Sequence, residues 1–245
     1  SEAKELNHQD ILHAVGNIDK EIQKRMIEID DEIGFVCRTK NSYDGKFQVC
    51  LMNDTMYDGM LGICLFYRTL YSCSNDIKHL QIADRIFKQL CGHWKESYFG
   101  IDMNTIPISP LSGITGLLYL MERFPDLHNH SIYTSIVEEV KRLIPTTNQY
   151  DYMSGLAGLI LFIVQCKLIG EEDKQTILKG CAERIVQLAT TTKGQTYWTY
   201  TDGNKIIGEK QLVLGGFAHG SSSMALAMFQ LFKHLKNRRY FGMFY

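Results

Sequence analysis

His219 is the clearest candidate for a chemical role, because it stands directly before an apolar stretch of helical length. An imidazole exchanges protons near pH 7, and its neutral form offers one nitrogen as donor and the other as acceptor. At a helix start the ring can instead serve structurally, by accepting a hydrogen bond from an unpaired first-turn amide. The residue is therefore interpreted either as a proton-transfer group or as a satisfied structural histidine.

The surroundings of His219 repeat three earlier segments, each with two glycines three positions apart and an apolar run behind them. These segments are residues 58–62, 112–116 and 154–158. Aligning Gly220 with the first glycine of each pair places three short polar residues level with His219. They are Asp58, Ser112 and Ser154. Such residues favour the helix N-cap, so we predict that they cap helices and that His219 occupies the same structural slot.

Each glycine-motif helix is expected to pair with an amphipathic helix that covers one of its sides. The expected pairs are 58–71 with 77–90, 112–123 with 132–143, and 154–168 with 175–189, followed by a fourth glycine-motif helix at 219–234. Two concentric layers satisfy this pattern, with the nearly uncharged helices inside. A closed ring is favoured, and an open solenoid of helix pairs is the alternative.

The N-terminal part has a different pattern. Apolar residues at three- and four-residue steps predict a helix over residues 9–33, and Asp44-Gly45 predicts a hairpin within 36–51. A second hairpin is expected over 197–207. The predicted fold is all-α, a partial α/α toroid with one or two short β-hairpin insertions. We expect one domain over 1–245, with the N-terminal helix and hairpin in 1–50 and the repeats in 51–245.

Composition excludes several classes of function. The formal charge of −1 gives no reason to expect a nucleic-acid partner, which needs a basic face. Seven cysteines without a Cys-x-x-Cys pair favour reduced thiols and a cytoplasmic location. We see no secretory leader, and the longest apolar run, 156–164, falls short of the roughly 20 residues of a membrane span.

Three segments carry a resemblance to a known family. Residues 56–66 (MYDGMLGICLF), 150–158 (YDYMSGLAG) and 216–220 (GFAHG) resemble the lanthionine synthetase cyclases, most closely the C-terminal cyclase region of class II lanthipeptide synthetases. The resemblance covers about 50–235 and implies an α/α toroid of seven helix pairs, of which this chain supplies the first four. It implies lanthipeptide (lantibiotic) biosynthesis, in which a peptide cysteine thiol adds to a dehydroalanine or dehydrobutyrine to form a thioether ring.

The same resemblance implies the site residues. It assigns His219 to handling the proton that the enolate takes up after sulfur attack, and Asp151 as its partner. The residues alone favour a structural role for Asp151 equally, as an acid in a turn or in the first turn of a helix, where the helix dipole stabilises a negative charge. The resemblance also implies a ribosomally made precursor peptide as partner, and zinc in the complete protein. The zinc-binding Trp-Cys-x-Gly and Cys-His-Gly segments have no match in this sequence.

We therefore expect no zinc bound to this chain. We interpret the chain as the N-terminal part of a cyclase that is inactive alone. It would need a complementary C-terminal half, or it would self-associate. The alternative is a non-catalytic module on the same scaffold that binds a peptide or a partner protein. A carbohydrate- or isoprenoid-active α/α barrel is a third interpretation, but it needs clustered carboxylates. The acidic runs, 30–32 and 171–173, are expected to be solvated surface.

Overall fold

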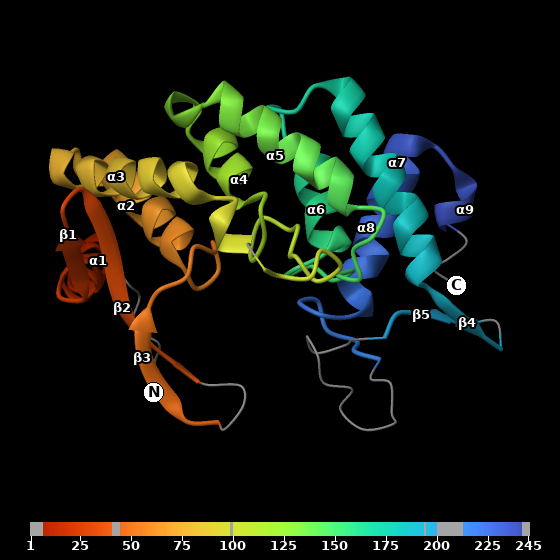
Figure 1. The fold of residues 1–245 in the computed structure, drawn as a ribbon, viewed down its shortest axis with the longest axis horizontal. Coiled ribbons are helices and arrows are strands. Elements are labelled where there is room, and N and C mark those ends of the chain that lie inside the picture. The colour runs from red at the N-terminus through yellow and green to blue at the C-terminus, as the bar shows by residue number, and fades with distance from the viewer. Residues whose placement is uncertain (1–6, 41–44, 99, 194, 200–212, 242–245) are drawn as a thin grey trace. The chain divides into compact units, whose positions relative to one another are not determined.

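A computed structural model describes residues 7–40, 45–98, 100–193, 195–199 and 213–241, and these fall into two compact units (Figure 1). Unit 1 consists of residues up to 54 together with 58–89, and unit 2 of residues 55–57 together with those from 90 onward. The described part is rich in helix and carries two small sheets, as predicted for the fold class.

Unit 1 contains α1 (His8–Gln23), α2 (Met60–Ser74), most of α3 (Ile77–His93) and an antiparallel sheet of β1 (Met26–Ile29), β2 (Glu32–Lys40) and β3 (Phe47–Leu51). Unit 2 contains α4 (Gly116–Arg123), α5 (His130–Leu143), α6 (Leu156–Ile163), α7 (Glu171–Leu188), α8 (Ser221–Leu235) and α9 (Arg238–Phe241). It also holds the short hairpin β4 (Thr190–Thr192) and β5 (Gln195–Tyr197), and the 3-10 turns η1 (Glu96–Tyr98) and η2 (Pro125–Leu127).

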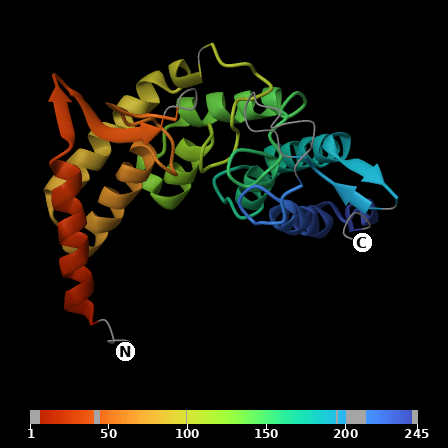
Figure 2. The ribbon, with the colours of Figure 1, turned by 90° about the horizontal axis from the view of Figure 1, so that it is seen from below.

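The predicted N-terminal helix over 9–33 is confirmed as far as Gln23 and is wrong beyond it. Helix α1 ends at Gln23, and the chain turns into the β1–β2 hairpin, which Figure 2 shows following α1. Asp30 makes the turn with φ of 53°, a conformation that ends regular structure. Ile33 and Phe35 are both buried, two positions apart, so the strand period rather than the helix period sets this segment.

The first predicted hairpin is confirmed. Strands β2 and β3 pair in the register Lys40↔Phe47 through Val36↔Leu51. Unit 2 also holds the hairpin β4–β5, with Lys193 at φ of 52° in its turn. The second predicted hairpin, over 197–207, lies outside the described residues from residue 200 onward and stays a prediction.

The repeated glycine segments start their helices by a backbone contact, which corrects the prediction that Asp58, Ser112 and Ser154 are the N-caps. The N-caps of α2, α6 and α8 are the glycines Gly59, Gly155 and Gly220, and that of α4 is Thr115, none with a side-chain cap hydrogen bond. In all four segments the amide after the motif glycine donates to the carbonyl seven residues earlier. The pairs are Met60–Asn53, Ile114–Pro107, Leu156–Gln149 and Ser221–Leu214, at 2.7–3.2 Å.

Only glycine permits this approach of two backbones. A Cβ on Gly155 would lie 2.3 Å from the carbonyl carbon of Gln149, and one on Gly220 would lie 2.2 Å from the carbonyl oxygen of Leu214. The glycines therefore bring each incoming loop directly beneath the helix that follows it. The residue just before the glycine, which is His219 in the fourth segment, is held at the mouth of that helix.

The predicted amphipathic helices are confirmed as α3, α5 and α7. In unit 2, α6 packs against α7 and α8, α7 against α8, and α5 against α7 (Figure 1). The core between them consists of fully buried aliphatic side chains, including Leu143, Leu156, Leu159, Ile160, Leu178, Ile185 and Leu231. Because α6 is buried along most of its length, its N-terminal loop is held firmly against the loop before α8.

The carboxylate of Glu122 in α4 binds the segment between α6 and α7 by hydrogen bonds. Glu122 accepts the amides of Lys167 at 3.0 Å and Leu168 at 2.7 Å. Burial opposes the charge of Glu122, but these two backbone donors outweigh it and hold the pKa of the carboxyl below its ordinary value. Among the cysteines, Cys64, Cys166 and Cys181 are buried, whereas Cys73 is exposed.

Candidate functional site

The loop before α8 presents His219. Gly216 and Gly220 bracket the turn, the Ser221 amide donates to Leu214, and the Ser222 hydroxyl donates to Gly215 at 2.6 Å. These contacts fix the backbone on both sides of the histidine. The ring therefore projects from a constrained position, with 40% of its side chain exposed.

The equivalent loop before α6 presents Asp151, which is the predicted partner. Its Oδ1 accepts the Ser154 amide at 2.7 Å, and its backbone carbonyl accepts the Gly155 and Gly158 amides at 3.0 and 3.3 Å. The Asp151 side chain is 4% exposed. Because backbone donors hold both its carbonyl and one carboxylate oxygen, the second oxygen has a defined direction.

The structure brings the two predicted site residues together. His219 Nδ1 lies 2.6 Å from Asp151 Oδ2, and the loops are also joined by the Met153 amide, which donates to the Ala218 carbonyl at 3.2 Å. A carboxylate only accepts hydrogen bonds, so Nδ1 carries the proton in this contact. The neutral ring then has its lone pair on Nε2. A buried carboxylate orients the imidazole in this way in many proton-transfer sites.

Two aromatic rings stand beside this pair, and the sequence analysis did not single them out. Tyr152 and Phe217 meet edge to face, with centroids 4.9 Å apart, and 44% of Phe217 is exposed. The available signal was their equal offset, since each lies three residues before its motif glycine. Trp198, directly after β5, is instead buried and donates its indole N–H to the Ile185 carbonyl at 3.0 Å, so it packs against α7.

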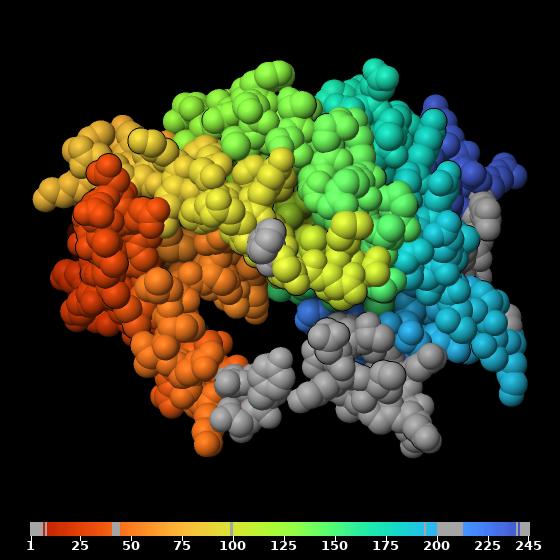
Figure 3. All heavy atoms as spheres, viewed as in Figure 1, coloured from red at the N-terminus to blue at the C-terminus, as the bar shows by residue number. Residues whose placement is uncertain are grey.

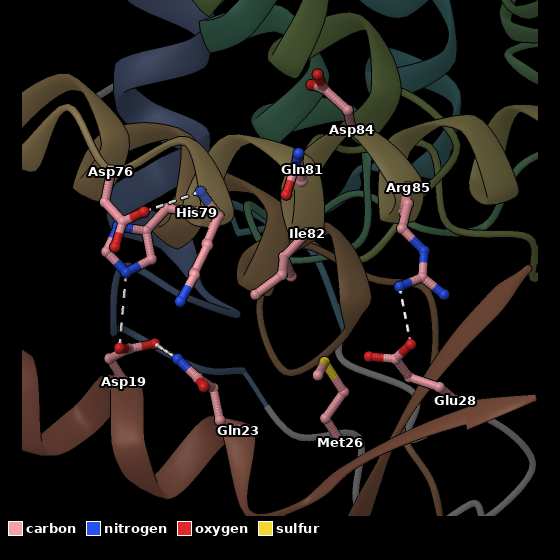
Figure 4. Close-up of a pocket in the computed structure, with 11 residues that line it drawn as sticks. Asp19, Gln23, Met26, Glu28, Asp76, His79, Gln81, Ile82, Asp84 and Arg85 are labelled. Carbon is pink, nitrogen blue, oxygen red and sulfur yellow. Dashed lines mark hydrogen bonds and ion pairs between the residues drawn. The ribbon is translucent and has the colours of Figure 1, made fainter.

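A second polar feature lies within unit 1, where a pocket of about 710 Å³ opens between α1, β1 and α3 (Figure 4). Two contacts join its walls, His79 Nε2 to Asp19 Oδ2 at 3.6 Å and the ion pair of Arg85 with Glu28 at 3.0 Å. Burial raises the pKa of the adjacent Tyr67. Because these polar groups already contact one another across the pocket, we assign it no chemical role.

The zinc implied by the resemblance was tested against the residues present. Among the described residues, no three His, Cys, Asp or Glu side chains are grouped so that they could hold a metal ion. Cys37 and Cys50 do face each other across β2 and β3, with sulfurs 3.6 Å apart, but two thiols fall short of a tetrahedral site. The described residues therefore do not fit a zinc site.

Comparison with known proteins identifies a family for most of the chain. The family model described as "Lanthionine synthetase C-like protein" matches residues 51–244. A comparison with curated proteins gave no match. Within the described residues, no helix is both long enough and apolar enough to cross a membrane. The family match spans all four glycine segments and both residues of the His219–Asp151 pair, so this chain belongs to the lanthionine synthetase C-like family.

Proposed function

We propose that this chain takes part in thioether ring formation in lanthipeptide biosynthesis, with His219 as the proton-transfer residue and Asp151 as the residue that orients it. Membership of the lanthionine synthetase C-like family supports this reaction class. The observation that carries the assignment is the 2.6 Å contact between His219 Nδ1 and Asp151 Oδ2. A purely structural histidine at a helix mouth needs no buried carboxylate from a separate loop.

The proposed reaction joins a cysteine thiol to a dehydroamino acid of the same peptide. The thiol gives up its proton to solvent, and the sulfur then forms a bond to Cβ. The electron pair of the broken C=C π bond moves toward Cα and the neighbouring carbonyl, as an enolate. His219, protonated at Nε2, delivers a proton to Cα. One proton leaves sulfur and one arrives at carbon, so the peptide is isomerised without a change of mass.

Asp151 has two parts in this scheme. It holds Nδ1–H, so that Nε2 is the nitrogen that gains and loses the proton. Its negative charge also offsets the positive charge of the ring while His219 holds that proton. Proton transfer by a positioned side chain typically contributes about 10²–10⁴-fold in rate.

A second candidate is a non-catalytic peptide-binding module on the same scaffold. The observation that favours it is the pair of rings Tyr152 and Phe217, because a half-exposed aromatic beside a fixed imidazole also suits simple peptide contact.

We further propose that α2, α4, α6 and α8 form the inner layer of an α/α toroid to which the whole chain belongs as one domain. The shared start of these four helices supports that arrangement.

The test uses a synthetic peptide that carries one dehydroalanine and one cysteine a few residues apart. It is incubated with the protein, zinc and a complementary C-terminal half, and free thiols are then alkylated and counted by mass spectrometry. We expect thiol loss with the wild-type protein and a rate lower by about 10²-fold or more with His219→Asn, which keeps a donor toward Asp151 but removes Nε2. Peptide that binds with all thiols retained would support the binding module instead.

A further inference from the structure

The sheet of unit 1 ends in an open edge at β3. The strand order is β1-β2-β3, and within the described residues β3 pairs only with β2. The Met52 amide donates to Phe35 at 2.8 Å, and the Val36 amide points the other way, to Arg25 at 2.9 Å. In an antiparallel ladder these contacts fix the alternation. The backbone N–H and C=O groups of Phe47, Val49 and Leu51 therefore point away from β2, along the open edge.

The same three residues also leave their side chains uncovered. Phe47 is 59% exposed, Val49 74% and Leu51 65%. The register places Ile27 and Ile29 of β1 on the same face, and both are exposed. Figure 3 shows the orange segment of β3 at the surface of unit 1. Proteins normally blunt an exposed apolar edge strand, because it is a template for pairing with another chain.

The charge on this face indicates what kind of chain fits. Arg38 and Lys40 of β2 lie on the same face, opposite Val49 and Phe47, and neither pairs with a described carboxylate. The Arg38 guanidinium lies 4.1 Å above the centre of the Phe47 ring, so its charge sits over β3 itself. An added strand would run about 4.8 Å beyond β3. Its residue beside Phe47 would then meet a cation that pairs with no carboxylate among the residues that the structure describes.

We propose that the β3 edge is a docking site for an extended, acidic polypeptide segment of a partner, which adds as a fourth strand antiparallel to β3. Its backbone bonds to the outward groups of Phe47, Val49 and Leu51. Its alternate apolar side chains extend the face that those residues begin. An acidic residue toward its C-terminal end meets Arg38 and Lys40, because that end of an antiparallel strand lies beside Phe47. The proposal does not depend on His219 or on thioether chemistry.

The probe is a fluorescein-labelled nine-residue peptide with valine at alternate positions, threonine between them and two glutamates at the C-terminal end. Fluorescence anisotropy with the full chain measures binding. One control peptide replaces the glutamates with lysines, and another carries N-methyl groups on the amides that would face β3. We expect the lysine peptide to bind at least tenfold more weakly, and the N-methylated peptide to show no binding.

Protein variants separate the two parts of the site. Val49→Pro removes an outward amide that the β2–β3 ladder does not use, and Val49→Thr is its matched control with the amide kept. We expect Val49→Pro to lose the peptide while its circular dichroism and melting temperature stay close to those of Val49→Thr. The double variant Arg38→Glu/Lys40→Glu should prefer the lysine peptide.

Several results would overturn the proposal. One is equal binding of the N-methylated peptide, and another is an unchanged preference in the charge-reversed protein. Self-association that Val49→Pro abolishes, with no peptide binding, would make a second copy the occupant. Binding to phosphatidylserine vesicles with no peptide binding would make the face a membrane contact.

Discussion

The contact between Asp151 and His219 makes a prediction that needs no substrate. The Ser154 amide lies 2.7 Å from Asp151 Oδ1 in the wild-type protein, and the side-chain oxygen of Asp151→Asn can still accept it. The NH₂ group of the new side chain then faces His219 Nδ1. Two donors cannot share that contact, so the neutral ring should shift its proton from Nδ1 to Nε2. The substitution therefore reverses the roles of the two ring nitrogens without changing the size of the side chain.

The size of the effect on stability follows from what is lost. One of the two carboxylate hydrogen bonds survives, and the other changes from a bond to a charged group, worth about 1.5–3 kcal/mol, to a neutral bond, worth about 0.5–1.5 kcal/mol. The expected loss is the difference, about 1 kcal/mol, and because 40% of the His219 side chain is exposed it should not exceed that value. For a chain of this length 1 kcal/mol shifts the melting temperature by about 2–4 °C, so Asp151→Asn should lower it by about 2–4 °C.

The assay is ¹⁵N NMR of protein labelled in histidine, which distinguishes the protonated from the unprotonated ring nitrogen, together with thermal unfolding. His219→Asn is the control for unfolding, because its amide still donates toward Asp151, and it should lower the melting temperature less than Asp151→Asn does. If the wild-type ring carries its proton on Nε2, or if Asp151→Asn changes neither tautomer nor melting temperature, the pairing does not exist in solution.

Three further predictions concern the scaffold. Gly155→Ala should destabilise the protein by about 2 kcal/mol or more in urea unfolding, whereas Gly92→Ala, whose new Cβ meets nothing within 4 Å, should stabilise it by about 0.5–1 kcal/mol; equal effects would show that the backbone approach is unimportant. Glu122→Gln should cost about 1–3 kcal/mol at pH 7. Because the pKa of Glu122 is lowered on folding, its contribution is present above its ordinary value of 4.5 and is lost as pH falls through the lowered value, so the gap between the two proteins should close in acid; a gap independent of pH contradicts this. Iodoacetamide at pH 8 should modify exposed Cys73 first and leave buried Cys166, whose pKa burial raises to about 11, unmodified in peptide mapping; the reverse order would place the thiols wrongly.

The repeats were accessible to sequence reasoning because each depends on a local signal. The motif glycines and apolar runs mark where α2, α4, α6 and α8 begin, to within a few residues. The caps were misassigned because the partner of the first amide is a carbonyl seven residues back, which is a matter of backbone geometry rather than of side-chain type. The 26–33 segment was misassigned because Met26, Ile29 and Ile33 fit a helical period, although Asp30 turns the chain.

The two site residues also differ in how far the sequence could predict them. His219 was distinguishable within the repeat, but Asp151 lies 68 residues away and was reached only through the family resemblance. Nothing local in the sequence tells that the loops before α6 and α8 touch through Met153 and Ala218. That contact depends on the packing of α6 against α8, which is a tertiary property.

The most direct test of the proposed role of His219 is the configuration of the newly formed Cα in the ring. A proton donor fixed on one side of the enolate should give a single epimer, which chiral gas chromatography of the hydrolysed product measures. We predict one epimer with the wild-type protein, and a mixture formed at a much lower rate with His219→Asn. A single epimer formed at an unchanged rate by His219→Asn would contradict the claim that this imidazole delivers the proton.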